Sequence, residues 1–136
     1  MNEATGWTKD AGWQMGVRRT LPIPPEFAWE FLMGDGLSLW LGHTALGRGA
    51  GEAYVTDEGV RGELRSRSEG RRVRLTWQPA GWSHDATLQL TVLPAASGTT
   101  IAFHQERLAN AAEREQMLAH WTTVLDNIGA ATTPEN

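Results

Sequence analysis

The sequence NAAEREQMLAHWTTVLDNIG, residues 110–129, contains the clearest helix of the chain. Asn110 and Glu113 form a capping box that predicts where this helix begins, and Gly129 predicts where it ends. Its apolar residues recur every three or four positions, which places them on one face. They are Met117, Leu118, Trp121, Leu125 and Ile128. Because such a stripe must be buried, we expect the helix to lie across the inner face of a sheet.

Upstream of this helix the apolar residues alternate with polar ones, which is typical of half-buried strands. Residues 72–78, 86–92 and 99–105 each follow this pattern, and the breaks at residues 79–82 and 94–98 are short. Short breaks predict an antiparallel meander rather than crossover connections. The inward-facing set is Val73, Leu75, Trp77, Ala86, Leu88, Leu90, Val92, Ile101, Phe103 and Gln105. His104 has the opposite parity and is expected to face outward.

The first third of the chain predicts one strand followed by two short helices. Residues 13–20 form the strand, and the prolines that follow end it because they donate no N–H to a ladder. The first helix begins at Pro25 and Glu26 and ends at Gly34, and a second helix covers residues 37–41. A glycine-rich loop over residues 42–51 and a turn over residues 56–59 then lead into the meander.

This order of elements resembles the helix-grip fold of the START-like (SRPBCC) superfamily. Seven local sequences are similar to the family named after the activator of the heat-shock-protein-90 ATPase (AHSA-type). They are Val17-Arg18-Arg19, Pro24-Pro25-Glu26-Phe27-Ala28-Trp29, Trp40-Leu41-Gly42, Gly59-Val60-Arg61-Gly62-Glu63, Arg72-Val73-Arg74-Leu75-Thr76-Trp77, Gly98-Thr99-Thr100-Ile101 and His120-Trp121. The resemblance implies an α+β fold in which an antiparallel sheet of about six strands wraps around a long C-terminal helix. Two short helices would follow the first strand, and the family name suggests a link to the stress response.

The size and composition of the chain limit its possible classes. With 136 residues, we expect an N-terminal extension at 1–12, one START-like domain at 13–129 and a tail at 130–136. The lack of cysteine excludes a disulfide framework and a thiolate metal site. The polar start and the short apolar runs favour a cytoplasmic protein without a membrane span. A net charge of -4 argues against nucleic acid as a partner, and we expect a monomer or homodimer.

Seven tryptophans in so short a chain suggest the wall of a ligand cavity, because each indole joins an apolar body to one N–H donor. The leading hypothesis is a binding domain for a small hydrophobic or amphipathic molecule, held between the sheet and the last helix. Gln105 and the indole N–H groups would supply its polar contacts. The expected lining is Trp40, Val73, Leu75, Trp77, Trp82, Leu88, Leu90, Ile101, Phe103, Gln105, Met117, Trp121 and Leu125. Trp29 is assigned to the core, and simple core packing is the alternative explanation for Trp40, Trp77, Trp82 and Trp121.

Half of the twelve basic residues are arginines of one predicted hairpin, Arg61, Arg65, Arg67, Arg71, Arg72 and Arg74. Two interpretations stay open. The hairpin is either a solvated outer face paired with Glu63 and Glu69, or a surface for an acidic protein partner. The second interpretation would use Arg61, Arg65, Arg67, Arg72 and Arg74. It matches the hypothesis that the chain is a protein-interaction module related to chaperone ATPase activators.

A third hypothesis is an enzyme of the cyclase or hydrolase type, because relatives in the superfamily use the same cavity for polyketide cyclisation. The acid–base candidates are Glu63, Asp85, Glu106 and His120, and none forms an evident pair, so no catalytic residue is assigned. Many relatives carry a histidine where this chain has Gln105. The four histidines lack the spacing of a helical metal site, and no metal or cofactor is expected.

Overall fold

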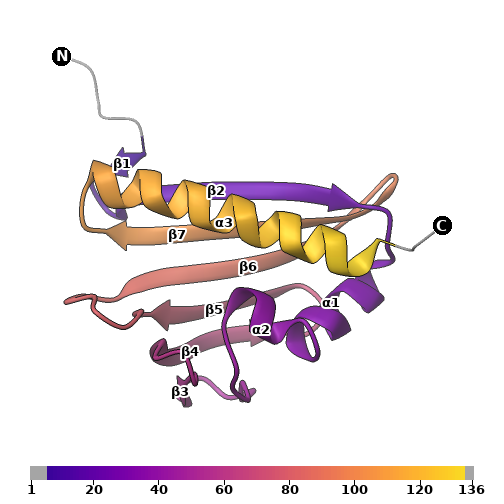
Figure 1. Ribbon diagram of the computed structural model, residues 1–136, viewed down its shortest axis with the longest axis horizontal. Helices are drawn as coiled ribbons and strands as arrows, with labels where there is room; N and C mark the ends of the chain where they lie inside the picture. The colour runs from indigo at the N-terminus through magenta and orange to yellow at the C-terminus, as the bar shows by residue number, and fades with distance from the viewer. Residues whose placement is uncertain (1–5, 134–136) are drawn as a thin grey trace.

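The computed structural model describes residues 6–133, which form one sheet and three helices (Figure 1). The strands are β1 (Trp7–Thr8), β2 (Gly12–Leu21), β3 (Ala53–Val55), β4 (Arg61–Ser68), β5 (Arg72–Trp77), β6 (Ala86–Ala95) and β7 (Gly98–Leu108). The helices are α1 (Pro25–Met33), α2 (Leu37–Trp40) and α3 (Ala111–Thr132). This is the α+β helix-grip arrangement that the sequence predicts.

The strands are ordered β1-β2-β7-β6-β5-β4-β3, and all neighbours are antiparallel. The run from β3 to β7 is an antiparallel meander, as predicted, and β2 joins it beside β7. Within the described residues the sheet has seven strands rather than about six. The additional strand is β1, which pairs with β2 through Trp7 and Trp13 and belongs to the segment predicted as an N-terminal extension.

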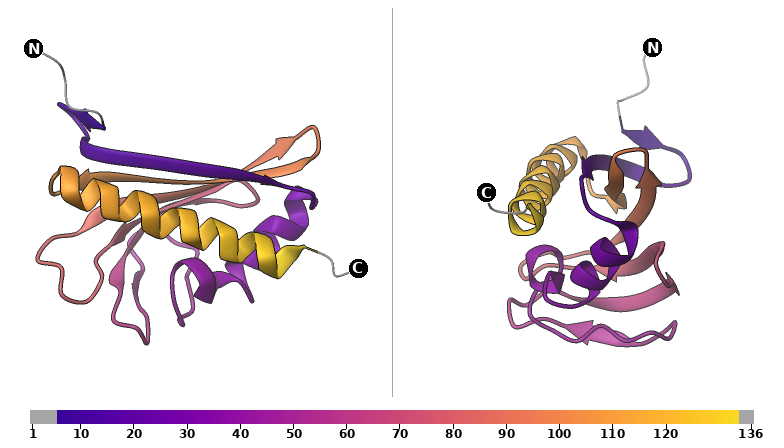
Figure 2. Two further views of the ribbon diagram at one scale, coloured as in Figure 1. Left: turned by 45° about the horizontal axis from the view of Figure 1, so that its top comes forward. Right: turned by 90° about the vertical axis from the view of Figure 1, so that its right-hand side faces the viewer.

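All three helices lie on one face of the sheet (Figure 2). Helix α3 packs mainly on β2 and also contacts β7, while α1 and α2 cover the lower half in Figure 1. We call the helix-covered side the inner face and the other side the outer face. The outer face is not covered by any part of residues 6–133. None of the helices in this range is both long and apolar enough to cross a membrane.

The capping box of α3 is confirmed, but the predicted end of the helix is wrong. The Glu113 N–H donates to the Asn110 side chain at 2.8 Å, and the Glu113 carboxylate accepts the Ala109 N–H at 3.0 Å. The helix then continues through Gly129 to Thr132. A Cβ at Gly129 would lie 3.0 Å from the guanidinium carbon of Arg19. The glycine therefore lets α3 approach β2 closely, and it does not terminate the helix.

The hairpins follow the predicted order with one shorter turn. β6 continues through Pro94, which pairs with Thr99, so the break before β7 is confined to Ala96 and Ser97. β7 also runs three residues beyond Gln105, to Leu108. Gly34 follows α1 as predicted. The turn at residues 56–59 joins β3 to β4 as expected.

Candidate functional site

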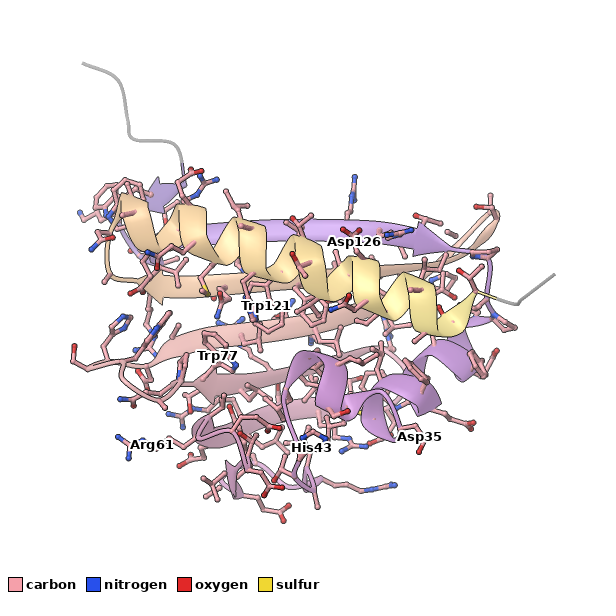
Figure 3. The ribbon with its side chains drawn as sticks, in the orientation of Figure 1. Asp35, His43, Arg61, Trp77, Trp121 and Asp126 are labelled. Atoms are coloured by element: carbon pink, nitrogen blue, oxygen red, sulfur yellow. The ribbon has the colours of Figure 1, made fainter. Side chains whose placement is uncertain are left out.

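Aromatic rings fill much of the space between α3 and the inner face. Trp121 of α3 stacks on Phe103 of β7, with ring centroids 4.7 Å apart. Trp77 of β5 lies 5.5 Å from Trp121 and meets Trp82 edge-on at 5.3 Å. Figure 3 shows Trp121 next to α3 and Trp77 further from that helix, over the strands of the sheet. We call these four residues the inner aromatic cluster.

Two buried hydrogen-bond donors in this region lack partners. Trp121 donates its Nε1–H to the Gln105 Oε1 at 2.8 Å, which fixes the orientation of the amide. The Nε2 of Gln105 and the Nε1 of Trp77 are buried and make no hydrogen bond within the described residues. By contrast, Trp40 donates to the Leu32 carbonyl at 2.8 Å. An unsatisfied buried donor costs about 1–3 kcal/mol, so the interior has an unmet demand for acceptors.

A hollow of about 180 Å³ opens at one end of the aromatic cluster. It lies where α2, the turn before β4, the end of β5 and the middle of α3 come together. We call it the Trp77 hollow. Its lining residues are Ser38, Leu39, Trp40, Leu41, Gly42, Glu58, Val60, Trp77 and His120. Trp77 therefore borders both the buried cluster and a space open to solvent.

Two histidines give the rim of the Trp77 hollow its electrostatic character. The His43 N–H donates to Glu58 at 2.8 Å, and the His43 ring pairs with the same carboxylate. This contact raises the pKa of His43 and lowers the pKa of Glu58 to about 2. His120 packs on Trp77 and Trp121, and the desolvation that follows lowers its pKa. At neutral pH the rim therefore has an ionised Glu58 and an uncharged His120.

The thirteen residues expected to line a cavity lie on the predicted side, but most of them contact each other. All are buried except Trp82, which is half-buried at the rim and stacks on His84 at 4.9 Å. Of the thirteen, Trp40 and Trp77 border the Trp77 hollow. The parity prediction for β7 is confirmed, because Gln105 is buried while His104 donates its Nε2–H to the Gln14 Oε1 on the outer face.

Among the remaining lining residues, His120 was considered only as an acid–base candidate, and Glu58 and Val60 were missed by sequence analysis. Glu58 and Val60 lie in the turn before β4, where no period of two or 3.6 assigns a side. The sequence did mark Trp40-Leu41-Gly42 and the turn at residues 56–59, but only as elements of the fold. Gly42 has a φ of +132°, and a Cβ there would lie 2.8 Å from Thr56. The two segments are therefore packed closely at the rim.

The arginine hairpin divides between the two faces. Arg65 pairs with Glu63 at 3.0 Å, as the solvated-face interpretation predicts, whereas Arg74 pairs with Glu106 of β7 at 2.5 Å, a partner that it did not name. Arg67 differs, because its side chain is only 5% exposed. A β-bulge between Leu64 and Ser66 reverses the parity of the residues that follow.

The prediction that Arg67 is available to a partner is therefore wrong. Its guanidinium donates to Glu69 at 2.5 Å and to the Gly47 carbonyl at 2.9 Å, and it lies over the Trp29 ring. The arginine thus holds the glycine-rich loop against the sheet. Trp29 itself is buried, as assigned, and donates to Glu69 at 3.0 Å.

The acid–base candidates do not converge. Glu106 is on the outer face with Arg74, whereas His120 lies on α3 against the inner aromatic cluster. Asp85 pairs with Arg107 at 3.0 Å, and Glu63 pairs with Arg65. Within residues 6–133, no group of three or more histidine and carboxylate side chains is arranged to hold a metal ion. The geometry thus offers donors and apolar rings rather than an acid–base pair.

Comparison with known proteins identifies the fold. No protein-family model and no curated protein matches the chain. DynU16, of the dynemicin biosynthetic locus, is similar with a TM-score of 0.76 and 19% identity, over 86% of this chain and 46% of DynU16. The chain thus spans less than half of that protein. CalU16 from Micromonospora echinospora has a TM-score of 0.75 and 16% identity, over 89% of this chain and 76% of CalU16.

A third similar structure is PFC0360w, an HSP90 activator from Plasmodium falciparum. Its TM-score is 0.70 at 14% identity, over 87% of this chain and 94% of that protein. These likenesses confirm the α+β helix-grip fold that the sequence resemblance implied. At such identities they show the fold alone.

Proposed function

We propose that the protein binds a small, uncharged and mostly apolar molecule that carries a hydrogen-bond acceptor. The molecule would enter at the Trp77 hollow and lie against the inner aromatic cluster. The observation that supports this proposal most directly is the pair of buried donors without partners, Trp77 Nε1 and Gln105 Nε2. A carbonyl or ether oxygen of a ligand would accept from one of them and remove its desolvation cost.

The packing around Trp77 supports entry at this point. No hydrogen bond from residues 6–133 holds its indole, and the half-buried Trp82 covers one edge of the ring. Movement of these two side chains would enlarge a hollow that now measures about 180 Å³. This volume is below the roughly 300 Å³ at which ligand pockets usually begin, so binding requires such a movement. The neighbouring Trp121 is fixed by its bond to Gln105 and would form the floor.

The charges at the rim favour an uncharged ligand. Glu58 is ionised at neutral pH, but its charge is already paired with the His43 ring, whose pKa the contact raises. His120 is held largely uncharged by its contact with two indoles, so the lining of the hollow offers no positive charge to an anion. Uncharged amphipathic molecules with one or two oxygen atoms are therefore the class to test first.

Calorimetric titration with a panel of uncharged aromatic ketones and lactones tests the proposal, with the melting temperature measured in parallel. Trp77→Phe keeps an aromatic ring and removes the donor, so it should weaken binding about 3- to 10-fold. Trp29→Phe is the matched control, because its indole bonds to Glu69 and borders Arg67 instead of the hollow. The proposal fails if no member of the panel binds, or if both variants bind equally well.

A second candidate is a protein-interaction module, since PFC0360w is described as an HSP90 activator. The uncovered outer face and the exposed Arg61, Arg65 and Arg72 would provide the contact surface. An ATPase assay with the cognate chaperone, with and without the protein, separates the two candidates. Stimulation that the charge reversal Arg72→Glu abolishes would favour this candidate, and an unchanged ATPase rate would remove it.

A further inference from the structure

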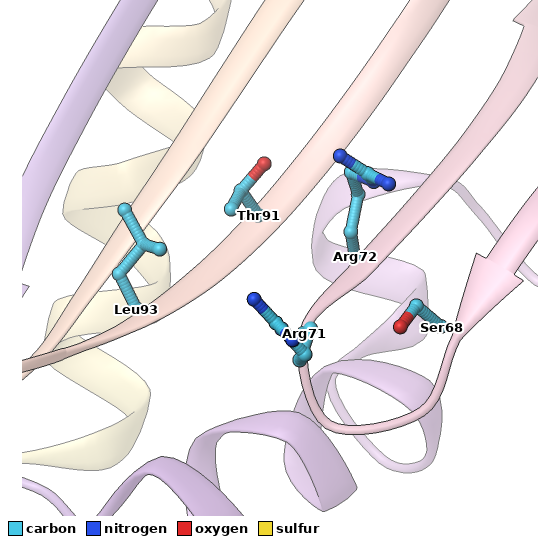
Figure 4. Close-up of a pocket in the computed structure, with 5 residues that line it drawn as sticks. All are labelled: Ser68, Arg71, Arg72, Thr91 and Leu93. Carbon is cyan, nitrogen blue, oxygen red and sulfur yellow. The ribbon is translucent and has the colours of Figure 1, made fainter.

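We infer a second binding site, on the outer face, that takes the phosphate group of a small organic phosphate ester. The site is a hollow of about 250 Å³ beside the β4–β5 turn, lined by Ser68, Arg71, Arg72, Thr91 and Leu93 (Figure 4). In Figure 4 the helices lie behind the sheet, so these side chains are on the face opposite α3. This hollow therefore shares no lining residue with the Trp77 hollow.

Arg71 and Arg72 have charges that the described part of the chain does not neutralise. The arginine ion pairs in residues 6–133 involve other residues, namely Arg19, Arg65, Arg67, Arg74, Arg107 and Arg114. Two carboxylates of the neighbouring strands and turn have other partners. Glu69 turns to the inner side, where it accepts from Arg67 and Trp29, and Glu106 accepts from Arg74. Two adjacent guanidinium groups are thus left to attract an anion.

The backbone fixes the positions of both arginines. The Arg71 N–H donates to the Ser68 carbonyl at 3.0 Å, and the Arg71 carbonyl accepts the Val92 N–H at 2.8 Å. Gly70, with a φ of +79°, provides the left-handed residue that this tight turn uses. The turn is therefore held on one side by β4 and on the other by β6, which limits how far Arg71 can move.

Two hydroxyl groups flank the arginines. Ser68 is opposite Arg72 in the β4–β5 ladder, and Arg72 is opposite Thr91 in the β5–β6 ladder. These three residues form one row across the sheet, with side chains on the outer face. The Thr91 hydroxyl accepts from Gln89 at 3.3 Å, so its own hydrogen is free to donate.

The set of donors suits a phosphate ester better than a carboxylate. A phosphate monoester carries a charge near −2 and three strong acceptor oxygens, which two guanidinium groups and two hydroxyls can share. A carboxylate has one charge and is satisfied by a single bidentate arginine. Leu93 borders the hollow and is 44% exposed, so an apolar group on the ester would have a surface to contact.

Titration of the full chain with phenyl phosphate, followed by backbone amide NMR, tests the inference. Signals of residues 68–72 and 91–93 should shift. Arg71→Gln and Arg72→Gln should each weaken binding about 10-fold or more, and Thr91→Val should have a smaller effect. Arg61→Gln is the matched control, since it removes one exposed arginine from the same hairpin but lies outside the hollow. Melting curves establish that each variant is folded.

The control ligands define the chemistry. Inorganic phosphate should shift the same signals with lower affinity, because it does not contact Leu93. Benzoate should bind more weakly than phenyl phosphate, and equal binding by benzoate would overturn the preference for phosphate. Equal losses in Arg61→Gln and Arg72→Gln would show general charge attraction and overturn the site. No shift at millimolar phenyl phosphate, or shifts around Trp77 instead, would overturn it as well.

Discussion

The two faces of β5 are built from alternate residues of the same six-residue strand, yet they offer opposite chemistry. Val73, Leu75 and Trp77 face the helices and are buried, while Arg72 and Arg74 face away from them. The inner face has donors that need acceptors in a dry space. The outer face has positive charges that need anions in water. One strand thus contributes to two surfaces whose chemistry suits two different classes of ligand.

Ligand binding on the two faces would also be limited by different factors. A hydrogen bond to Trp77 or Gln105 would form away from water, so it gains from the low local dielectric but requires space. The charges of Arg71 and Arg72 are accessible without any movement, but salt screens them. Binding on the inner face should therefore depend on side-chain packing, and binding on the outer face should depend on ionic strength.

The largest expected effect concerns packing on the inner face. Trp121→Ala removes a fully buried ring that contacts Phe103 and Trp77, so the free energy of unfolding should fall by about 3–5 kcal/mol. Leu93→Ala on the outer face should change it by about 0.5 kcal/mol or less. Urea denaturation measures both. A loss below about 1.5 kcal/mol for Trp121→Ala would mean that the indole lies in loosely packed space.

A smaller effect is expected for two neighbours on β7 that face opposite ways. Gln105→Leu leaves the Trp121 N–H buried without its acceptor, at a cost of about 1–3 kcal/mol of unfolding free energy, and the removal of the unpaired Gln105 Nε2 should offset only part of that cost. His104→Leu removes a partly exposed contact with Gln14 and should cost about 1 kcal/mol or less. Urea denaturation of the two variants gives the comparison. Equal losses of unfolding free energy in the two variants would mean that the inner and outer faces of β7 do not differ in this respect.

The double variant Gln105→Leu with Trp121→Phe isolates the buried bond. Both partners are then apolar, so no buried polar group is left without a partner. The double variant should therefore lose less unfolding free energy than the two single variants lose together, by about 0.5–1.5 kcal/mol. Additive losses would mean that the Trp121–Gln105 bond contributes nothing to stability.

The smallest expected effect is the pH dependence of the exposed His43–Glu58 pair. The pKa of Glu58 is lowered from 4.5 to about 2, so its contribution to stability is present above pH 4.5 and is lost as pH falls toward 2. The pKa of His43 is raised from 6.5, so its contribution is present below pH 6.5 and is lost as pH rises through the raised value.

Stability curves of the native chain and Glu58→Gln, measured from pH 2 to 9, should therefore differ most at about pH 4.5–6.5. The difference should shrink on both sides of this window and in high salt. Arg65→Gln, which breaks another exposed ion pair but no histidine contact, is the control. A difference that stays constant across the whole range would rule out the pair as its source.

Sequence periodicity predicted the elements and most of the inward-facing residues, because each strand keeps one face dry. At the β-bulge in β4, strand periodicity gave a wrong prediction. An extra residue is invisible to a period of two, so Arg67 was assigned to the outside although it anchors the glycine-rich loop. The prediction that α3 ends at Gly129 was wrong for a different reason. In the sequence, a glycine that permits close packing cannot be distinguished from one that ends a helix.

The candidate site was less predictable than the fold. Strand parity could assign Trp77 and Gln105 to the interior, but ring orientation decides whether the indoles enclose a cavity or fill it. The structure shows Trp121 in contact with Phe103 and Trp77, which leaves the smaller hollow at the end of the cluster. The pair formed by His43 and Glu58 joins two loops fifteen residues apart, a contact that no local pattern encodes.

The close spacing of Trp77, Trp82 and Trp121 has an optical consequence. With ring centroids 5.3 Å and 5.5 Å from Trp77, the three indoles are near enough for their electronic transitions to couple. Coupled transitions split into bands of opposite sign in circular dichroism, and excitation energy passes readily between the rings. The entrance of the hollow therefore has a built-in spectroscopic signal, and any turn of Trp77 would alter that signal while the strand and helix content stays constant.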